Sequence, residues 1–148
     1  KRWYDTGDLG YLNEKGFWDV LKYSRAPVIA SHSCCRALCD HPRNLHNEQL
    51  AALGEKGGVV GITFVPFFID DDEPGLEKLL DHIEHAVEHA GAACVGLGSD
   101  FDGGGDLLRD AGQYPDIGAG LVRRGLDQAA LTGILGANHL DLLRRSIG

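Results

Sequence analysis

The chain has 148 residues, of which 43% are hydrophobic and 24% are charged, and 22 acidic residues against 14 basic ones give a net charge of −8. This length and composition indicate one globular domain, or a part of a larger one, with enough apolar material for a core. The acidic balance argues against a nucleic-acid-binding protein, which usually presents a basic face. The longest apolar run, Val59 to Ile69, is too short to span a bilayer, so we expect no transmembrane segment.

The amino terminus shows no secretory leader, and the first residue is Lys1 rather than Met. We therefore expect the natural start to lie upstream, and the lack of a leader favours a cytoplasmic location for this chain. Four cysteines include the adjacent pair Cys34 and Cys35 but no CxxC spacing. This pattern favours reduced thiols over a disulfide framework.

The first predicted elements, in chain order, are a helix, a strand and a second helix. An aromatic and apolar pattern indicates a helix over about 14–24. The apolar run at 27–32 (PVIASH) does not alternate with polar residues, which is typical of a strand covered on both faces. After a polar loop, a helix is predicted over 47–56 and ends at Gly57 and Gly58.

The rest of the chain repeats this alternation. Strands are predicted at 58–64 (GVVGITF) and 93–99 (ACVGLGS), with a helix between them that begins near Pro74 and ends at Gly91. Two more helices, over 126–135 and 137–147, are separated near Gly136. The three strands start at residues 27, 58 and 93, so their starts lie 31 and 35 residues apart, about one βα unit.

Strands that alternate with helices at this spacing predict an α/β fold with a parallel sheet. Three or four such units would make about half of an eight-unit barrel, which typically needs about 250 residues. An open, doubly wound sheet fits the same pattern, and periodicity alone does not choose between the two.

Candidate catalytic residues lie where the predicted strands end. Functional groups gather at the carboxyl ends of strands in α/β proteins, and here His32 ends PVIASH while Asp100 follows CVGLGS. An imidazole can bind a divalent metal, and a carboxylate can bind metal or move a proton. Taken singly, His32 could pack against the sheet and Asp100 could cap a loop. Their matching positions favour a site.

The loop over 33–46 adds a candidate for substrate binding. Arg43 lies in the sequence HPRN, where Pro42 restrains the backbone and helps to fix the side chain. A forked guanidinium suits a substrate carboxylate. The alternative is an arginine on a solvated loop.

Two other patterns carry less weight. His82, His85 and His89 lie at i, i+3 and i+7 of a predicted helix and could imitate a metal cluster, but acidic residues surround them, so we interpret them as surface histidines. The segment at 100–106 (DFDGGGD) is similar to a calcium loop, yet its fifth position is Gly104 and no glutamate stands at the twelfth.

Three segments together resemble one protein family. APVIASHSCCRALCDHPRNL at 26–45, LLDHIEHAVEHAGAACVGLGSDFDG at 79–103 and YPDIGAGLVRRG at 114–125 are similar, in order and spacing, to the carboxyl-terminal part of the membrane dipeptidase (renal dipeptidase) family. The resemblance runs from about Leu12 to the end. It implies the carboxyl-terminal half of a (β/α)8 TIM barrel, a zinc cofactor and a dipeptide substrate.

The resemblance also implies roles for the three candidate residues. His32, in the SHS segment, matches a zinc-binding histidine of the family. Arg43 matches the arginine that holds the terminal carboxylate of the dipeptide. Asp100, the first aspartate of GSDFDG, matches the acid that contacts the amine side of the substrate and shuttles a proton. In the family's mechanism a metal-bridging hydroxide attacks the peptide carbonyl while zinc polarises its oxygen.

The chain also departs from the family. A second zinc histidine is expected 21 residues before His32, and Tyr11 occupies that position. The amino-terminal barrel half, with its HxD ligands, a bridging glutamate and another substrate histidine, has no counterpart in this sequence. We therefore expect that this chain does not bind two zinc ions tightly by itself.

The first residues carry a separate resemblance. WYDTGDLGY at 3–11 is similar to a motif of adenylate-forming enzymes such as acyl-CoA synthetases, but nothing downstream supports that family. A splice, a divergent strand and an artefact of gene assembly all remain open. We divide the chain into an amino-terminal segment of undecided origin, 1–11, and a dipeptidase-like half barrel, 12–148.

Three functions compete at this point. The sequence favours a zinc dipeptidase represented by part of its barrel, over a scaffold or binding remnant that has lost its metal site. A remnant of an adenylate-forming ligase is the least favoured. A half barrel leaves sheet edges and apolar helix faces uncovered, so we also expect a homo-oligomer, an aggregation-prone chain or a partly ordered one.

Overall fold

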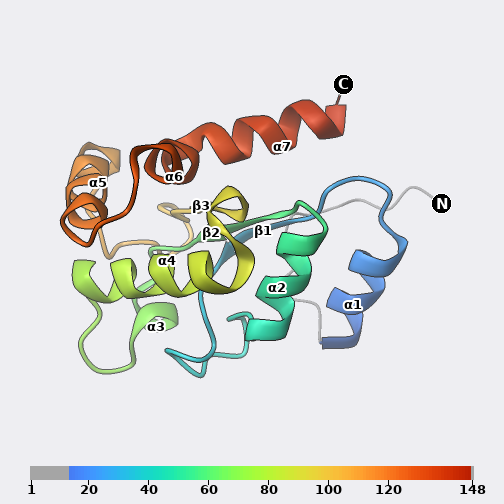
Figure 1. Ribbon diagram of the computed structural model, residues 1–148. Helices are drawn as coiled ribbons and strands as arrows, with labels where there is room; N and C mark the ends of the chain where they lie inside the picture. Colours follow the sequence, from blue (N-terminus) through green and yellow to red (C-terminus); the bar gives the residue numbers. More distant parts are fainter. Residues whose placement is uncertain (1–13, 148) are drawn as a thin grey trace.

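The computed structural model describes residues 14–147. Its sheet contains three parallel strands in the order β1-β2-β3. The strands are β1, Ile29–Ser33; β2, Val59–Ile62; and β3, Val95–Leu97. Figure 1 shows them between α2 and α4 on one side and α7 on the other. The predicted α/β alternation with a parallel sheet is confirmed, although each strand is shorter than its apolar run.

Helices fill the segments between the strands and after them. Their bounds are α1, Glu14–Tyr23; α2, Asn47–Glu55; α3, Pro66–Ile69; α4, Leu76–Ala90; α5, Tyr114–Arg123; α6, Gln128–Thr132; and α7, Asn138–Ile147. The sequence predicted the first, second, fourth and last two of these. It did not predict α3 or α5. The kink between α6 and α7 lies at Gly136, where φ is 154°, as the break near that glycine predicted.

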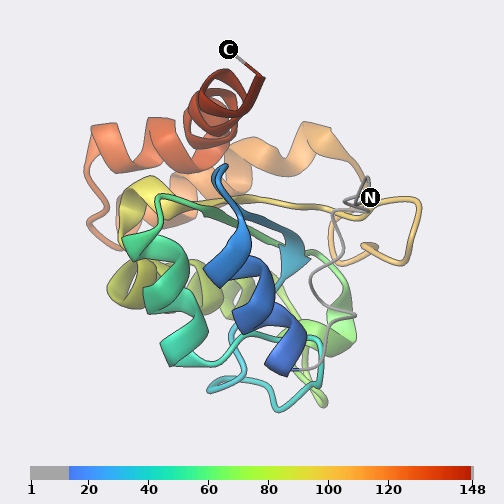
Figure 2. The ribbon, with the colours of Figure 1, turned by 90° about the vertical axis from the view of Figure 1, so that its right-hand side faces the viewer.

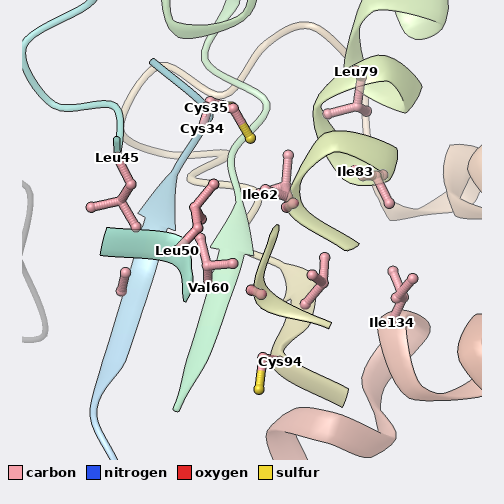
Figure 3. Packing of buried hydrophobic residues seen from close by; sticks show 14 of the residues in the cluster. Cys34, Cys35, Leu45, Leu50, Val60, Ile62, Leu79, Ile83, Cys94 and Ile134 are labelled. Carbon is pink, nitrogen blue, oxygen red and sulfur yellow. The ribbon is translucent and has the colours of Figure 1, made fainter. Parts of the chain in front are cut away.

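The core forms around the central strand. All four residues of β2 are buried because helices cover both of its faces. Figure 3 shows Leu50 of α2 and Leu79 and Ile83 of α4 beside Val60 and Ile62 of β2. Burying side chains of this size contributes about 1.5–3 kcal/mol each before conformational entropy is counted. The continuous apolar run is therefore explained by burial on both faces.

Glycines allow neighbouring segments of the sheet to approach one another closely. A Cβ added at Gly61 or at Gly98 would collide with the carbonyl oxygen of Ser31 in the neighbouring part of the sheet. Only glycine permits backbones to approach this closely. The close approach of these segments brings the carboxyl ends of the strands together.

The outer helices differ in how completely they are covered. Figure 2 shows α1 beside α2, and Phe17 and Leu21 bury the inner face of α1. On α7, by contrast, Leu140, Leu143 and Ile147 remain exposed, as expected of a half barrel. Association of chains through such faces stays a prediction. Among the described residues, no helix is both long enough and apolar enough to cross a membrane.

Candidate functional site at the carboxyl edge of the sheet

His32 lies in a bulge of β1. Ala30 pairs with Val60 and Ser33 pairs with Ile62, so β1 has one more residue than β2 between the two pairs. A β-bulge of this kind bends the strand and redirects a side chain, and bulges are frequent beside functional sites. The half-buried His32 lies in this irregular part of the strand.

The ring of His32 is held at both nitrogens. Its Nε2 lies 2.7 Å from Nη2 of Arg43, and its Nδ1 lies 2.9 Å from the Oγ of Ser31. A guanidinium can only donate hydrogen bonds, so Nε2 of His32 must accept one. Nδ1 then carries the proton and donates it to Ser31. The structure thus brings two of the predicted site residues into direct contact and fixes a neutral tautomer.

Several contacts fix Arg43 in the loop that follows β1. Its guanidinium carbon lies 5.2 Å from the centre of the Phe68 ring, a cation–π arrangement. Its carbonyl oxygen accepts a hydrogen bond of 2.8 Å from the Oγ of Ser33. The ring of His41 stacks on Phe68 with centroids 4.1 Å apart. Arg43 is half-buried and is not the freely solvated loop arginine that was the alternative.

Asn44, which sequence reasoning did not single out, holds this loop together. The residue is 3% exposed. Its Oδ1 accepts from the backbone N–H of Cys34 at 3.1 Å, and its Nδ2 donates to the carbonyls of Cys39 and Phe68 at 3.0 and 2.7 Å. Its side chain therefore links the residue that follows β1, the loop and α3, and fixes the backbone next to Arg43. The available signal was its position directly after Arg43 in HPRN.

Asp100 lies at the same edge of the sheet, across β2 from His32. The backbone N–H of Thr63 donates to the carbonyl of Ser33 at 3.1 Å, and that of Phe64 donates to Ser99 at 3.2 Å. These bonds place the residues beside His32 and Asp100 on either side of the same segment. The three predicted residues therefore share the carboxyl edge, but Asp100 contacts its own turn rather than the histidine or the arginine.

The turn after β3 holds Asp100 in an unusual conformation. Asp100 has φ of 59°, and it is the one non-glycine residue with positive φ among residues 14–147. The left-handed region costs roughly 1–2 kcal/mol for most residues and less for aspartate. The N–H groups of Gly103 and Gly105 donate to its carbonyl at 3.0 and 2.7 Å, and a Cβ at Gly103 would collide with its carboxylate. Such strain often accompanies a functional role.

None of His32, Arg43 and Asp100 lines the hollow at the start of α2. This hollow of about 350 Å³ is lined by Arg36, Ala37, Asp40, His46, Asn47 and Glu48. The four cysteines are buried free thiols, as predicted, and burial raises the pKa of Cys35 to about 12.

The interpretation of the α4 histidines as surface residues is wrong for His82. His82 is 1% exposed and bridges three segments. Its Nδ1 accepts from the backbone N–H of Cys35 at 3.0 Å, and its Nε2 donates to the carbonyl of Ile69 at 2.8 Å. Burial lowers the pKa of His82 below its ordinary value. The sequence places an imidazole among acidic neighbours but does not reveal these backbone partners.

The described residues do not by themselves fit the two-zinc site that the resemblance implies. Within 14–147, no group of three or more side chains able to hold a metal includes His32. Its Nε2 accepts a hydrogen bond from Arg43, and a metal ion there would need that lone pair. Tyr11 and the segment 1–11 lie outside the described residues. Further ligands would have to join His32 for a metal centre at this edge.

Comparisons with known proteins agree with the resemblance. The model of a family described as membrane dipeptidase (Peptidase family M19) matches residues 7–146. Dipeptidase verJ of Clonostachys rogersoniana is 39% identical over 139 residues, which cover 92% of this chain and 36% of verJ. An uncharacterized protein in the pqqA 5′ region of Klebsiella pneumoniae is 39% identical over 145 residues, 93% of this chain and 53% of that protein.

Solved structures match over the same extent. A metallo peptidase from Rhodobacter sphaeroides, crystallised with a phosphinate mimic of the dipeptide L-Ala-D-Ala, is similar with a TM-score of 0.86 and 37% identity over 94% of this chain and 42% of its own. The fold is therefore part of a (β/α)8 TIM barrel, and the open doubly wound alternative is excluded. The chain spans between about a third and a half of the length of these curated relatives.

Proposed function

The chain belongs to the membrane dipeptidase family, and on that premise we propose that it forms one side of the active site of a metal-dependent dipeptidase. The observation that carries the proposal is the 2.7 Å contact between Arg43 and His32 at the carboxyl edge of the sheet. Functional groups of a (β/α)8 barrel gather at this edge. Asp100 lies at the same edge on the other side of β2.

Each of the three residues has a role in this proposal. Arg43 binds the terminal carboxylate of a dipeptide through its forked guanidinium, which Phe68 and the backbone hold in place. His32 is a metal ligand once its Nε2 is released from Arg43. Asp100 contacts the amine end of the substrate and moves a proton there. The substrate's carboxylate takes the place of the imidazole of His32 as a partner of Arg43.

The metal of the complete site is proposed to be zinc, with two ions. His32 is the one described residue that matches a metal ligand of the family, so the other ligands must come from outside 14–147. A zinc site needs about three or four protein ligands, and a single imidazole does not hold the ion tightly. The proposed activity therefore requires the remaining part of a dipeptidase barrel.

A non-catalytic scaffold or binding remnant is the alternative. Two observations favour it: Arg43 holds the Nε2 of His32, and Tyr11 stands at the position of a second family ligand. In this alternative the contact between Arg43 and His32 is a permanent structural bond rather than a resting state of a catalytic site.

The test is to assay zinc content after dialysis and hydrolysis of L-Ala-D-Ala, the dipeptide whose mimic is bound to the Rhodobacter relative. The chain alone is expected to show neither two tightly held zinc ions nor turnover. Co-expression with the amino-terminal part of that relative is expected to restore both. In the restored enzyme, Arg43→Gln should lower kcat/KM about 100-fold or more, because the charge-assisted pair between the guanidinium and the substrate carboxylate is lost.

The matched control is Arg36→Gln, an arginine of the same loop that pairs with the exposed Asp40. Its activity should stay within about twofold of the restored enzyme, because exposed pairs contribute little. Absence of both tightly held zinc and hydrolysis in the co-expressed complex would favour the non-catalytic remnant, which has lost its metal site. Two tight zinc ions and turnover by the chain alone would contradict the expected incompleteness of this site.

A further inference from the structure

A second group of possible metal ligands lies on the outer face of α4 and includes none of His32, Arg43 and Asp100. His85, Glu88 and His89 each offer one ligand atom, and these atoms lie within 4.8 Å of one another. The two imidazole rings are 4.4 Å apart between centroids. The histidines are half-buried and Glu88 is exposed, so solvent can deliver an ion to the group.

Helix geometry brings the three residues together. Positions i, i+3 and i+4 of a helix are neighbours on one face. The opposite face of α4 is fixed in the core by Leu79, Leu80 and Ile83, none of which is exposed. The backbone that carries the ligands is therefore rigid before any ion binds, which reduces the entropic cost of assembling a site.

Asn47, the first residue of α2, orients one of the imidazoles. Its Oδ1 lies 2.8 Å from Nε2 of His85. Because a carbonyl oxygen only accepts, Nε2 carries the proton and Nδ1 keeps its lone pair. Metal-binding histidines usually donate their second N–H to an oxygen in this way, which fixes the tautomer and raises ligand basicity.

Glu88 is not committed to a salt bridge within the described part of the chain. Glu77, Asp81 and Glu84 of the same helix all pair with Arg124, at 2.7 Å each. No arginine or lysine among residues 14–147 pairs with Glu88. Its carboxylate is therefore available to a cation that the two histidines also bind.

We propose that His85, Glu88 and His89 form a site for a divalent first-row transition metal, with zinc as the representative ion. Two imidazoles and a carboxylate suit zinc, copper and nickel better than calcium or magnesium, which prefer oxygen ligands. Donor atoms around tetrahedral zinc lie about 3.4 Å apart, so small side-chain rotations would bring the three ligand atoms to this spacing. The hydrogen bond between His85 and Asn47 links this site to α2. This site is independent of the proposed dipeptidase activity.

The experiment titrates zinc chloride into the metal-free full chain at pH 7.5, with calorimetry for stoichiometry and NMR of the histidine side chains for location. Wild type should bind zinc with shifts of the His85 and His89 ring nitrogens. The double variant His85→Gln, His89→Gln should lose this equivalent of zinc. Glu88→Gln should weaken it at least tenfold. His32→Gln should retain it, which separates this site from the carboxyl edge.

Thermal unfolding supplies a second readout. Zinc should raise the Tm of wild type and of His32→Gln but not that of the double variant, because a ligand of the folded state stabilises it by mass action. Circular dichroism in the presence of a chelator checks that each variant folds. If the double variant does not fold, Glu88→Gln, a change at an exposed residue, replaces it in the test. The proposal is overturned if wild type binds no zinc at concentrations up to 1 mM, where a Kd of that size corresponds to a binding free energy of about −4 kcal/mol. It is also overturned if the double variant still binds this equivalent of zinc, or if zinc leaves the His85 and His89 signals of wild type unshifted.

Discussion

The histidine at the end of β1 and the histidines on the outer face of α4 belong to the same residue type but to different chemistry. His32 is held between a guanidinium and a serine hydroxyl, so both of its nitrogens have partners fixed by the fold. His85 has one nitrogen on Asn47 and faces a second imidazole and a carboxylate. A metal at the strand end must displace an arginine, whereas a metal on α4 meets ligands that already converge.

The two regions also differ in what builds them. The carboxyl edge depends on backbone contacts, namely the close approach at Gly61 and the hydrogen bonds of the buried Asn44. The outer face of α4 depends on side chains that stand on a helix whose other face is packed. Substitutions should therefore unfold the first region and merely remove the ligands of the second.

The largest effect is expected for Gly61→Ala. The new Cβ would collide with the carbonyl oxygen of Ser31 and crowd Gly98, and backbone atoms cannot move aside as a flexible side chain can. We expect a loss of about 3 kcal/mol or more in the free energy of unfolding, measured by urea titration. The control is Gly75→Ala, where no atom lies within 4 Å of the added Cβ. Equal unfolding midpoints for the two variants would show that the close approach at Gly61 does not limit the stability of the sheet.

Asn44→Ala should lower the free energy of unfolding by about 3 kcal/mol, somewhat less than Gly61→Ala. The variant leaves the N–H of Cys34 and the carbonyls of Cys39 and Phe68 buried without this partner, and each such group costs about 1–3 kcal/mol. Urea unfolding checks the loss. Asp40→Asn, in the same loop but with an 83% exposed side chain, should change stability by less than about 1 kcal/mol. A mild Asn44 variant would mean that the loop is held by other contacts.

These two sites mark the limit of what sequence predicts. The strand positions and most helices followed from apolar runs and glycine breaks, because burial leaves a periodic signal. The edge location of His32 and Asp100 followed from parallel pairing. The bond between His32 and Arg43 did not, because it depends on a bulge in β1 that periodicity does not encode. The metal roles of His32 and the proton role of Asp100 come from resemblance and stay proposals.

The α4 histidines teach the complementary lesson. A helical spacing of i, i+3 and i+7 placed His82, His85 and His89 on roughly one face, but the structure separates them. His82 faces the core, where Cys35 and Ile69 supply partners, and the other two face outward beside Glu88. The sequence alone could not tell which histidine has buried backbone partners, because those partners lie 47 and 13 residues away along the chain.

Acid should destabilise the folded chain through His82. Its pKa in the folded state is lowered by burial, although the carbonyl of Ile69 and the carboxylates of Asp81 and Asp70 act in the opposite direction and His85 adds to the lowering. The unfolded chain therefore takes up this proton first as the pH falls below about 6.5. Stability from the neutral ring is present above that pH and is lost below it, and urea unfolding between pH 7.5 and 5 measures the loss.

His82→Gln separates this contribution from those of other histidines. The pKa values of His41, His85 and His139 are also lowered by burial, so some acid sensitivity remains in the variant. At pH 7.5 the variant should lose about 1–3 kcal/mol, because the N–H of Cys35 loses its acceptor. Its stability should then fall less steeply than that of wild type on acidification. Parallel pH profiles would show that His82 does not titrate with unfolding.

The smallest effect is expected for Glu88→Gln without metal. Glu88 is exposed and forms no salt bridge within residues 14–147, so in chelator the free energy of unfolding should change by no more than about 0.5 kcal/mol. Glu84→Gln, one turn earlier, loses a bond to Arg124 and should cost up to about 1 kcal/mol. Urea titration of both variants in chelator checks the order. A loss above 1 kcal/mol for Glu88→Gln would mean that the carboxylate of Glu88 already stabilises the metal-free fold. The outer face of α4 would then contribute to folding stability, as the carboxyl edge of the sheet does.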